Sequence, residues 1–259
     1  MVEYPKGGIS MKKLFPPMMN SPEKGAGFAV LAYGVVCFFL APYLILLFMH
    51  EMIHKVDVMT WWEIGYHLMS FFVVISLYRQ YLADSVFEAR LDWKRIAEIV
   101  AICAIVIVGF YVALVQVYPL LAGRELTLAL NNMLPMTEMD LFWTSGSVVA
   151  SNPVWGTLCM VLVVPFVTVL IYYASGFATF CCDRPWLGYV MVAVVTALPR
   201  IANAVTLWSP ADQMVLYFTR LPIHLLSCWI FQKTDNVWTP IALHMVVNLA
   251  ACVMIILAI

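Results

Sequence analysis

The residues of this sequence best suited to chemistry are a histidine and an asparagine near its C-terminus. His244 and Asn248 are four positions apart in an almost wholly apolar run, 238–258, so a helix there presents both on one face. The run is long enough to cross a bilayer. An imidazole can transfer a proton, and both groups can donate hydrogen bonds to a developing oxyanion. Because polar groups in hydrocarbon are costly without partners, the pair indicates either an active site or a hydrogen bond between helices.

A second candidate motif lies earlier, in His50-Glu51-Met-Ile-His54. On a helix, two histidines at this spacing can bind zinc while the glutamate acts as a general base on the metal-bound water. Glu63 or His67 on the next apolar run can supply a third ligand. The alternative is a polar helix end, because charged residues follow the motif directly and tryptophans open the next run. Zinc is therefore an alternative cofactor, and the sequence indicates no other.

Three further polar side chains fall within apolar runs: Arg200, Arg220 and His224. Arginine is among the costliest groups in hydrocarbon, and Arg220 and His224 share a helix face at a spacing of four. We expect these residues to line a polar cavity that binds an anionic group, such as a peptide carboxylate. The alternative is that the arginines bond to helix-end carbonyls or to Asp212, or extend to the membrane interface.

The elements that must position these residues are membrane helices. The chain of 259 residues is 64% hydrophobic and 11% charged, which excludes a soluble domain, and its net charge of −1 gives no support to nucleic-acid binding. The predicted fold is all-α, a polytopic transmembrane helical bundle of about seven spans. The spans are 28–49, 60–78, 96–118, 154–174, 186–206, 213–231 and 238–258. The polar segment between Arg124 and Pro153 leaves room for an eighth, short or re-entrant element.

Charge placement predicts the orientation of this bundle. Lysines precede the first span, and arginines and lysines fill the connection between the second and third spans and recur in two later connections on the same side. By the positive-inside rule the N-terminus is cytoplasmic, which makes residues 1–27 a cytoplasmic segment. We therefore expect a multi-pass protein of the cell membrane, the plasma membrane of a prokaryote, with membrane lipids as its first partners.

The C-terminal part of the sequence carries a family pattern. Residues 231–249 run Phe-Gln-Lys-Thr-Asp-Asn-Val-Trp-Thr-Pro-Ile-Ala-Leu-His-Met-Val-Val-Asn-Leu, and Pro165 and Pro185-Trp186 precede them. This pattern resembles the CPBP family of CAAX proteases, bacteriocin-processing proteins and Abi proteins. The resemblance covers 154–259, where it implies a CPBP-like four-helix membrane core; 28–153 are then variable membrane helices with an outside loop. It also implies an intramembrane endopeptidase with Glu-Glu-x-x-x-Arg, Phe-x-x-x-His and His-x-x-x-Asn motifs.

The first two of these motifs are degenerate in this chain. Counted from the prolines, the glutamate pair falls near Thr168 and Val169 and the motif arginine near Tyr173. The histidine of the second motif falls on Arg200. No Asp or Glu occurs within 141–182, so a shifted alignment does not restore the acid. Only the final motif survives, and the family's water-activating base is missing from its place.

We therefore expect a catalytically degenerate homologue, a pseudoenzyme that acts as a membrane partner, a regulator or a bacteriocin immunity protein. Its cavity binds a peptide or another membrane protein, and the residues expected to line it are Thr168, Tyr173, Arg200, Arg220 and His224. The alternative is an active intramembrane endopeptidase. That enzyme is either a divergent CPBP protease using His244 and Asn248, or a zinc metalloprotease using His50 and His54 with Glu51 as base.

Overall fold

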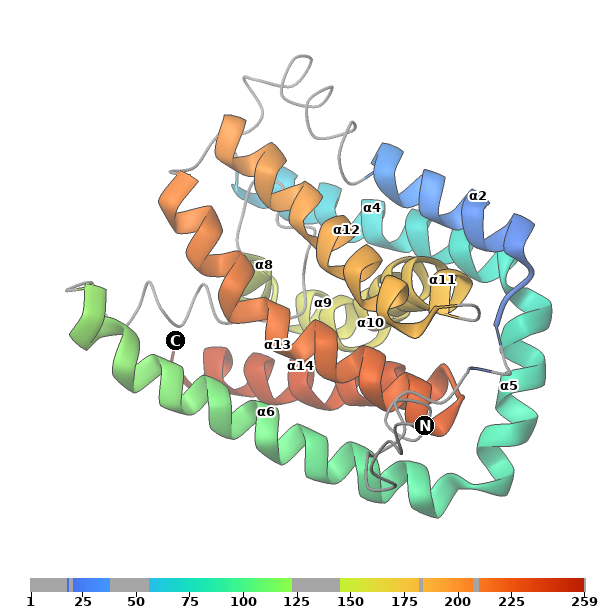
Figure 1. The fold of residues 1–259 in the computed structure, drawn as a ribbon. Helices are drawn as coiled ribbons and strands as arrows, with labels where there is room; N and C mark the ends of the chain where they lie inside the picture. The colour runs from blue at the N-terminus through green and yellow to red at the C-terminus, as the bar shows by residue number, and fades with distance from the viewer. Residues whose placement is uncertain are drawn as a thin grey trace, which may run out of the picture.

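The chain folds as a bundle of helices (Figure 1). The computed structural model describes residues 18, 21–37, 56–122, 145–181, 184–206 and 210–258, and no strand occurs within them. The prediction of an all-α fold is confirmed for this part of the chain.

Apolar runs predicted from the sequence lie within helices, because a chain in lipid must satisfy its amide groups internally. The long helices around the centre are α4 (Val56–Leu77), α6 (Trp93–Ala122), α12 (Pro185–Thr206), α13 (Pro210–Thr234) and α14 (Trp238–Ala258). The first run begins in α2 (Lys24–Val35), and 38–55 lie outside the described residues.

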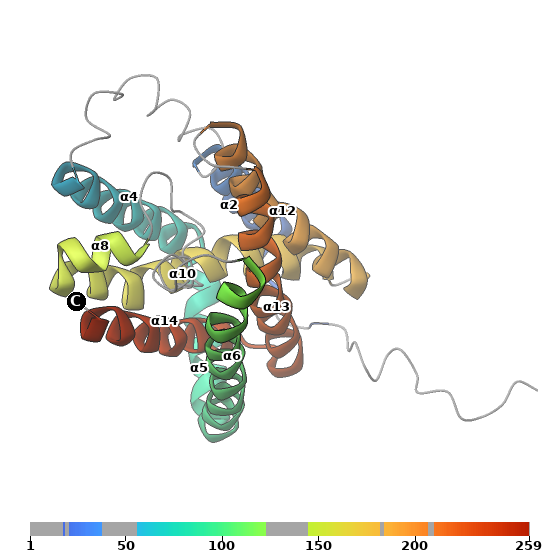
Figure 2. The same cartoon turned by 90° about the vertical axis from the view of Figure 1, so that its left-hand side faces the viewer.

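The central element is one continuous helical stretch, Pro153–Cys181. It consists of α9 (Pro153–Leu158), η2 (Cys159–Val163), α10 (Val164–Thr168), η3 (Val169–Ala178) and α11 (Thr179–Cys181), where η denotes a π-helix. Asn152 begins the stretch by accepting a hydrogen bond from the Trp155 amide, and Pro153 occupies the first helical position, where its missing N–H is not needed. The first half packs against α4 and α14, and η3 packs against α2, α12 and α13 (Figure 2). Other helices thus surround this stretch.

The π-helix η3 widens the central helix where every residue is buried. Ser175 Oγ donates to the Leu170 carbonyl oxygen at 2.8 Å, and Thr179 Oγ1 donates to that of Ala174 at 3.4 Å. Both bonds reach back five residues, so side-chain hydroxyls help to satisfy the carbonyls of the wide turns. π-helical turns are rare in proteins, and those that occur are often at functional sites. In η3 they can present side chains in directions that a regular helix does not allow.

A short helix lies in the long connection where the sequence leaves room for an eighth element. This helix, α8 (Ser145–Ser151), packs against α4, α9 and α14, and its Val148 and Val149 are fully buried. Gly156 permits the close approach of α9, because a Cβ there would lie 2.7 Å from the Val148 carbonyl oxygen. The end of the connection is therefore part of the packed bundle.

Three stretches of the described chain are long and apolar enough to cross a membrane: Trp93–Ala113, Pro153–Cys181 and Trp238–Leu257. A shorter apolar helix covers Pro185–Leu198. These stretches support the expectation of a membrane protein.

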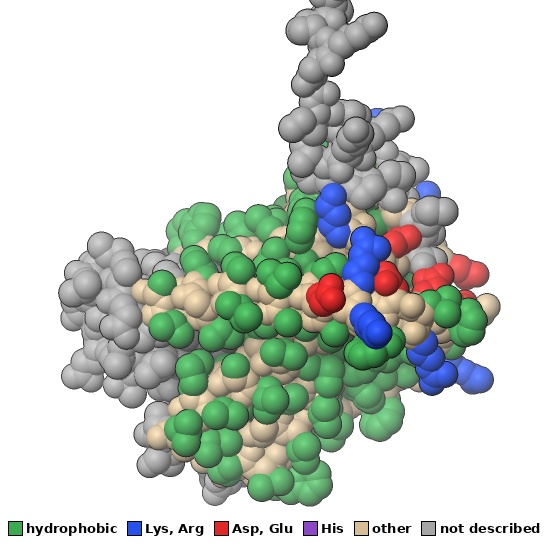
Figure 3. Space-filling model, turned by 90° about the horizontal axis from the view of Figure 1, so that it is seen from below, with side chains coloured by type: hydrophobic (Ala, Val, Ile, Leu, Met, Phe, Trp, Pro, Cys, Tyr) green, Lys and Arg blue, Asp and Glu red, His purple; other side chains and the backbone are tan. Residues whose placement is uncertain are grey.

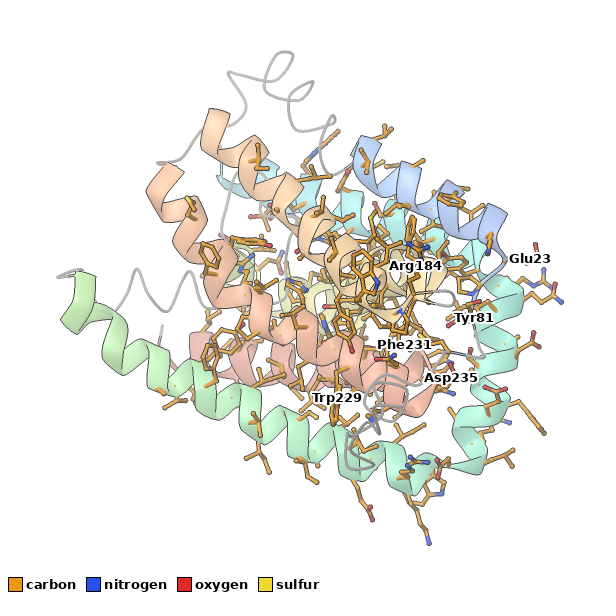
Figure 4. All side chains as sticks on the ribbon, viewed as in Figure 1. Glu23, Tyr81, Arg184, Trp229, Phe231 and Asp235 are labelled. Atoms are coloured by element: carbon orange, nitrogen blue, oxygen red, sulfur yellow. The ribbon has the colours of Figure 1, made fainter. Side chains whose placement is uncertain are left out.

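Polar residues from several connections meet at one end of the bundle. Figure 4 shows Glu23, Tyr81, Arg184 and Asp235 towards the same end, the right-hand end in that view. Glu23 lies just before α2, and Tyr81 lies in the first turn of the helix that follows α4. Arg184 lies just before α12, and Asp235 lies between α13 and α14. Four positions far apart in the sequence therefore share one end of the helices.

Candidate functional site

His244 and Asn248 are both buried, with exposed fractions of 0% and 1%. The Asn248 Nδ2 donates to the Met160 carbonyl oxygen at 2.7 Å. Met160 belongs to the π-helix η2, where the regular hydrogen-bond ladder of the central helix is interrupted. Asn248 thus anchors α14 to the central helix at an irregular turn.

Tyr173 in η3 joins two buried histidines, His224 and His244. Its hydroxyl oxygen lies 2.7 Å from His224 Nδ1 and 3.1 Å from His244 Nε2. The Tyr173 ring packs near both imidazoles, with ring centroids 6.1 Å from His224 and 5.4 Å from His244. The structure therefore brings together three residues that come from η3, α13 and α14.

The hydrogen bonds of this cluster can be assigned from the single proton of the phenol. Tyr173 can donate to only one imidazole, and the shorter distance favours His224. His244 then donates its Nε2 proton to the phenol oxygen. Each group is neutral in this arrangement, which lowers the free-energy cost of burying it away from water.

Ser227 is a member of the cluster that the sequence analysis did not identify. Its Oγ lies 3.1 Å from His244 Nε2 and is fully buried. Arg220, His224 and Ser227 are spaced by four and three, so they share one face of α13. That spacing could have identified Ser227 from the sequence. The part played by the Met160 carbonyl could not be predicted, because every residue has a backbone carbonyl.

The π-helical backbone explains how Tyr173 reaches this position. Consecutive residues of a regular helix diverge by about 100°. Here the rings of both Tyr172 and Tyr173 lie close to His224, with centroids 6.3 Å and 6.1 Å away. The wide turns of η3 place two adjacent aromatic side chains around one imidazole.

Two polar atoms of the final motif have no hydrogen bond among the described residues: His244 Nδ1 and Asn248 Oδ1. With His244 protonated on Nε2, both atoms are acceptors. The two residues are one helical turn apart, which places their Cβ atoms about 5–6 Å from each other. A water molecule or a primary amide, each with two N–H or O–H donors, satisfies both acceptors.

The other predicted cavity residues are placed as follows. Thr168 and Arg220 are buried, and Arg220 brings a guanidinium to the face of α13 that carries His224. Thr196, where the degenerate second motif begins, donates its hydroxyl to the Val192 carbonyl oxygen of its own helix at 2.8 Å. The side chain of Arg200 lies outside the described part of the structure.

The zinc motif His50-Glu51-x-x-His54 also lies outside the described residues. Its two candidate third ligands, Glu63 and His67, are described and buried, and His67 Nδ1 donates to the Glu63 carbonyl oxygen at 2.7 Å. Within the described ranges, no three His, Cys, Asp or Glu side chains are grouped so as to hold a metal ion.

A comparison with protein families matches residues 150–250 to the model described as type II CAAX prenyl endopeptidase Rce1-like. This part of the chain, less than half of it, is similar to that family. The resemblance to the CPBP family is thereby confirmed over the segment that carries Tyr173, His224, His244 and Asn248. Neither the curated proteins nor the solved structures include a match to the chain.

Proposed function

We propose that this chain is a membrane protein whose Rce1-like core has lost peptidase chemistry and binds a peptide or another membrane protein in the family's substrate cavity. It then acts as a partner, a regulator or an immunity protein. The observation that carries the proposal is the Tyr173 hydroxyl between His224 and His244. A neutral phenol stands where the resemblance places a residue of the first catalytic motif.

The chain lacks the general base that the family's peptidase reaction needs. Attack of water on a peptide carbonyl needs a group that accepts a proton near neutral pH. Thr168 and Val169, at the positions of the family glutamates, have no such group, and both are buried. Tyr173 falls at the position of the motif arginine and not of a glutamate, so its phenol does not supply the missing base.

The positive charge of Arg220 supports the binding of an anionic ligand. Arg220 is only 3% exposed and lies one helical turn from His224. A buried guanidinium favours an anionic ligand, because it forms short, charge-assisted bonds with carboxylates. The substrate class named in the matched family, a prenylated CAAX peptide, offers both an apolar chain and a terminal carboxylate.

The test uses the full chain in lipid nanodiscs with a farnesylated CAAX peptide. We expect no difference in product release between the original chain and His244→Ala, by mass spectrometry. We expect the peptide to bind the original chain and to bind Arg220→Gln about ten-fold more weakly, since a hydrogen bond to a charged group contributes about 1.5–3 kcal/mol. Arg184→Gln, at the exposed end of the bundle, is the matched control. Product release that depends on His244 would overturn the loss of chemistry, and absence of binding would overturn the cavity.

The second candidate function is an active endopeptidase, and one observation favours it. His244 Nδ1 and Asn248 Oδ1 are buried acceptors one turn apart that a single water can satisfy. A water held there is a candidate nucleophile. If the chain is an active endopeptidase, the original chain releases peptide product and Asn248→Leu does not. If it is a pseudoenzyme, neither protein releases product.

The zinc metalloprotease is the remaining enzyme hypothesis. It requires His50 and His54, with Glu63 or His67 as a third ligand, and the buried position of these last two is compatible with it. Metal analysis of the purified protein decides the matter. Stoichiometric zinc in the original chain that is absent from His54→Ala would overturn the pseudoenzyme proposal in favour of a zinc enzyme.

The topology that we propose has about seven spans, a cytoplasmic N-terminal segment (1–27), variable membrane helices with an outside loop (28–153) and the CPBP-like core (154–259), in the plasma membrane of a prokaryote. The shared end of Glu23, Tyr81, Arg184 and Asp235 supports it, since all four belong to predicted inside segments. This topology is tested by fusing a reporter enzyme to the chain after each loop. A reporter fused at Arg184 that is active outside the cell would contradict the proposed topology.

A further inference from the structure

The helix α5 (Arg79–Leu91) lies across the ends of the long helices (Figure 1). Its inner side is fixed to the bundle, where Leu82 and Ser85 are buried. Asn236, between α13 and α14, donates its Nδ2 proton to the Ser85 carbonyl oxygen at 2.9 Å. At the start of α5, the Tyr78 hydroxyl lies 2.5 Å from Ser175 Oγ of the central helix. The rotation of α5 about its own axis is therefore set, and so is the face that it turns outward.

That outward face carries large apolar side chains. Phe87, Leu91 and Trp93 have exposed fractions of 68%, 76% and 61%. The three lie within seven positions, at the bend where α5 ends and α6 begins. Single exposed apolar residues are ordinary, but a group of this size on a docked helix indicates a contact with something apolar. We call residues 87–95 the elbow.

The charges around this apolar face are separated by sign. A helix turns about 100° per residue, so Arg79 and Arg90 fall on one side of Phe87 while Asp84 and Glu88 fall on the other. All four charged side chains are exposed. The helix therefore has a basic flank and an acidic flank on either side of Phe87, and only the basic flank is complementary to phosphate.

The elbow also lies at one end of a stretch that is long enough to cross a membrane. The apolar stretch of α6 that is long enough to cross a membrane begins at Trp93, and tryptophan is typical of the membrane–water interface. Lys94 Nζ lies 6.0 Å from the centroid of the Trp93 ring. Figure 3 shows charged side chains gathered at the end of this face where α6 joins α5, with hydrophobic side chains over much of the rest. The elbow is thus the place where the apolar surface of α6 meets the charged side chains of α5.

We propose that the elbow binds anionic phospholipid: Phe87, Leu91 and Trp93 enter the boundary between headgroups and acyl chains, while Arg90 and Lys94 bind lipid phosphates. The acidic flank, Asp84 and Glu88, faces water. Arg95 contributes less, because Asp92 pairs with it at 3.4 Å. This interaction holds α5 at the membrane surface and is independent of what the Rce1-like cavity binds.

The first experiment measures insertion. A benzophenone side chain is introduced at position 87, 91 or 88 of the full chain in nanodiscs, and cross-linked products are weighed after irradiation. We expect lipid adducts at positions 87 and 91 and few at position 88. Position 105, exposed on the apolar stretch of α6, is the control for a lipid-facing residue. Lipid adducts at 105 together with none at 87 and 91 would overturn the proposal while leaving the membrane span intact; protein adducts at 87 and 91 would show that another chain covers the elbow, and would also overturn it.

The second experiment measures the charge preference. The protein is purified from membranes of equal parts phosphatidylcholine and phosphatidylglycerol, and the retained lipids are quantified. A basic residue near the surface favours anionic lipid by a factor of up to roughly five, so R90Q/K94Q lowers the phosphatidylglycerol preference several-fold. The matched control D84N/E88Q keeps or raises it. Equal preference in the original chain and in R90Q/K94Q would show that the elbow does not select anionic lipid.

Discussion

Replacing Tyr173 by phenylalanine removes the one hydroxyl that joins the two buried histidines. The ring, and with it the packing in η3, stays the same. His224 Nδ1 and His244 Nε2 lose the oxygen that lies 2.7 Å and 3.1 Å away. Ser227 Oγ, 3.1 Å from His244 Nε2, can still form a hydrogen bond with His244. The substitution therefore weakens the hydrogen bonding of His224 more than that of His244.

The expected loss of stability follows from these contacts. Hydrogen bonds between membrane helices contribute about 0.6 kcal/mol on average, which sets a lower limit of about 1 kcal/mol for two bonds. A buried group left without a partner costs about 1–3 kcal/mol, which sets an upper limit of about 6 kcal/mol for two such groups if Ser227 does not bond to His244. Because Ser227 is in place, we expect about 2 kcal/mol for Tyr173→Phe.

The assay is equilibrium unfolding in mixed micelles of a mild detergent and dodecyl sulfate, followed by circular dichroism. Tyr189→Phe is the matched control, because its hydroxyl donates to Gln232 Oε1 at 2.9 Å in a partly buried position and does not join two histidines. We expect this control to lose about 1 kcal/mol or less. If Tyr173→Phe is no less stable than Tyr189→Phe, the two histidines are not joined through the phenol and the closed cluster is refuted.

Two further substitutions test the packing around the site. Gly156→Ala places a Cβ 2.7 Å from the Val148 carbonyl oxygen and should lower the free energy of unfolding by about 1–3 kcal/mol, whereas Gly25→Ala, with open space around it, should not lower it. Asn236→Ala removes both the bond to the Ser85 carbonyl and the bond that Asn236 Oδ1 accepts from the amide at the start of α14, so hydrogen exchange should speed up in α5 and in the first turn of α14. Asn236→Asp keeps the acceptor and loses the donor, so only α5 should exchange faster; equal effects of the two variants would show that the bond to Ser85 does not hold α5.

The sequence predicted helices well where their apolar runs were long. The run 238–258 coincides with α14, and the run 186–206 lies within α12. The run 154–174 was too short, since the central helix continues to Cys181. Its end was missed because Ser175 and Thr179 appear polar in the sequence, whereas in the structure both bond to carbonyls of their own helix.

The meeting of Tyr173 with His224 and His244 depends on geometry that the sequence does not express. The resemblance marked Tyr173 as a substituted motif position, and spacing paired His224 with Arg220. Neither argument placed the phenol between the two imidazoles. That placement requires the π-helical turns of η3, and no residue pattern at Val169–Ala178 predicts them. What this cavity binds stays a prediction.

The phenol also bears on the proposed loss of peptidase chemistry at this site. A carboxylate beside two buried histidines must be compensated, by imidazolium or by water, and the family's chemistry uses that charge. Tyr173, at the position of the motif arginine, joins His224 and His244 through a neutral hydroxyl, which lowers the free-energy cost of burying the cluster in hydrocarbon. The same bonds join η3 to α13 and α14, which fits the proposed role of this site in binding rather than in cleavage. Restoring the family's base therefore requires an acid at position 168 or 169, where the motif glutamates fall, and its carboxylate would be buried there and would need compensation.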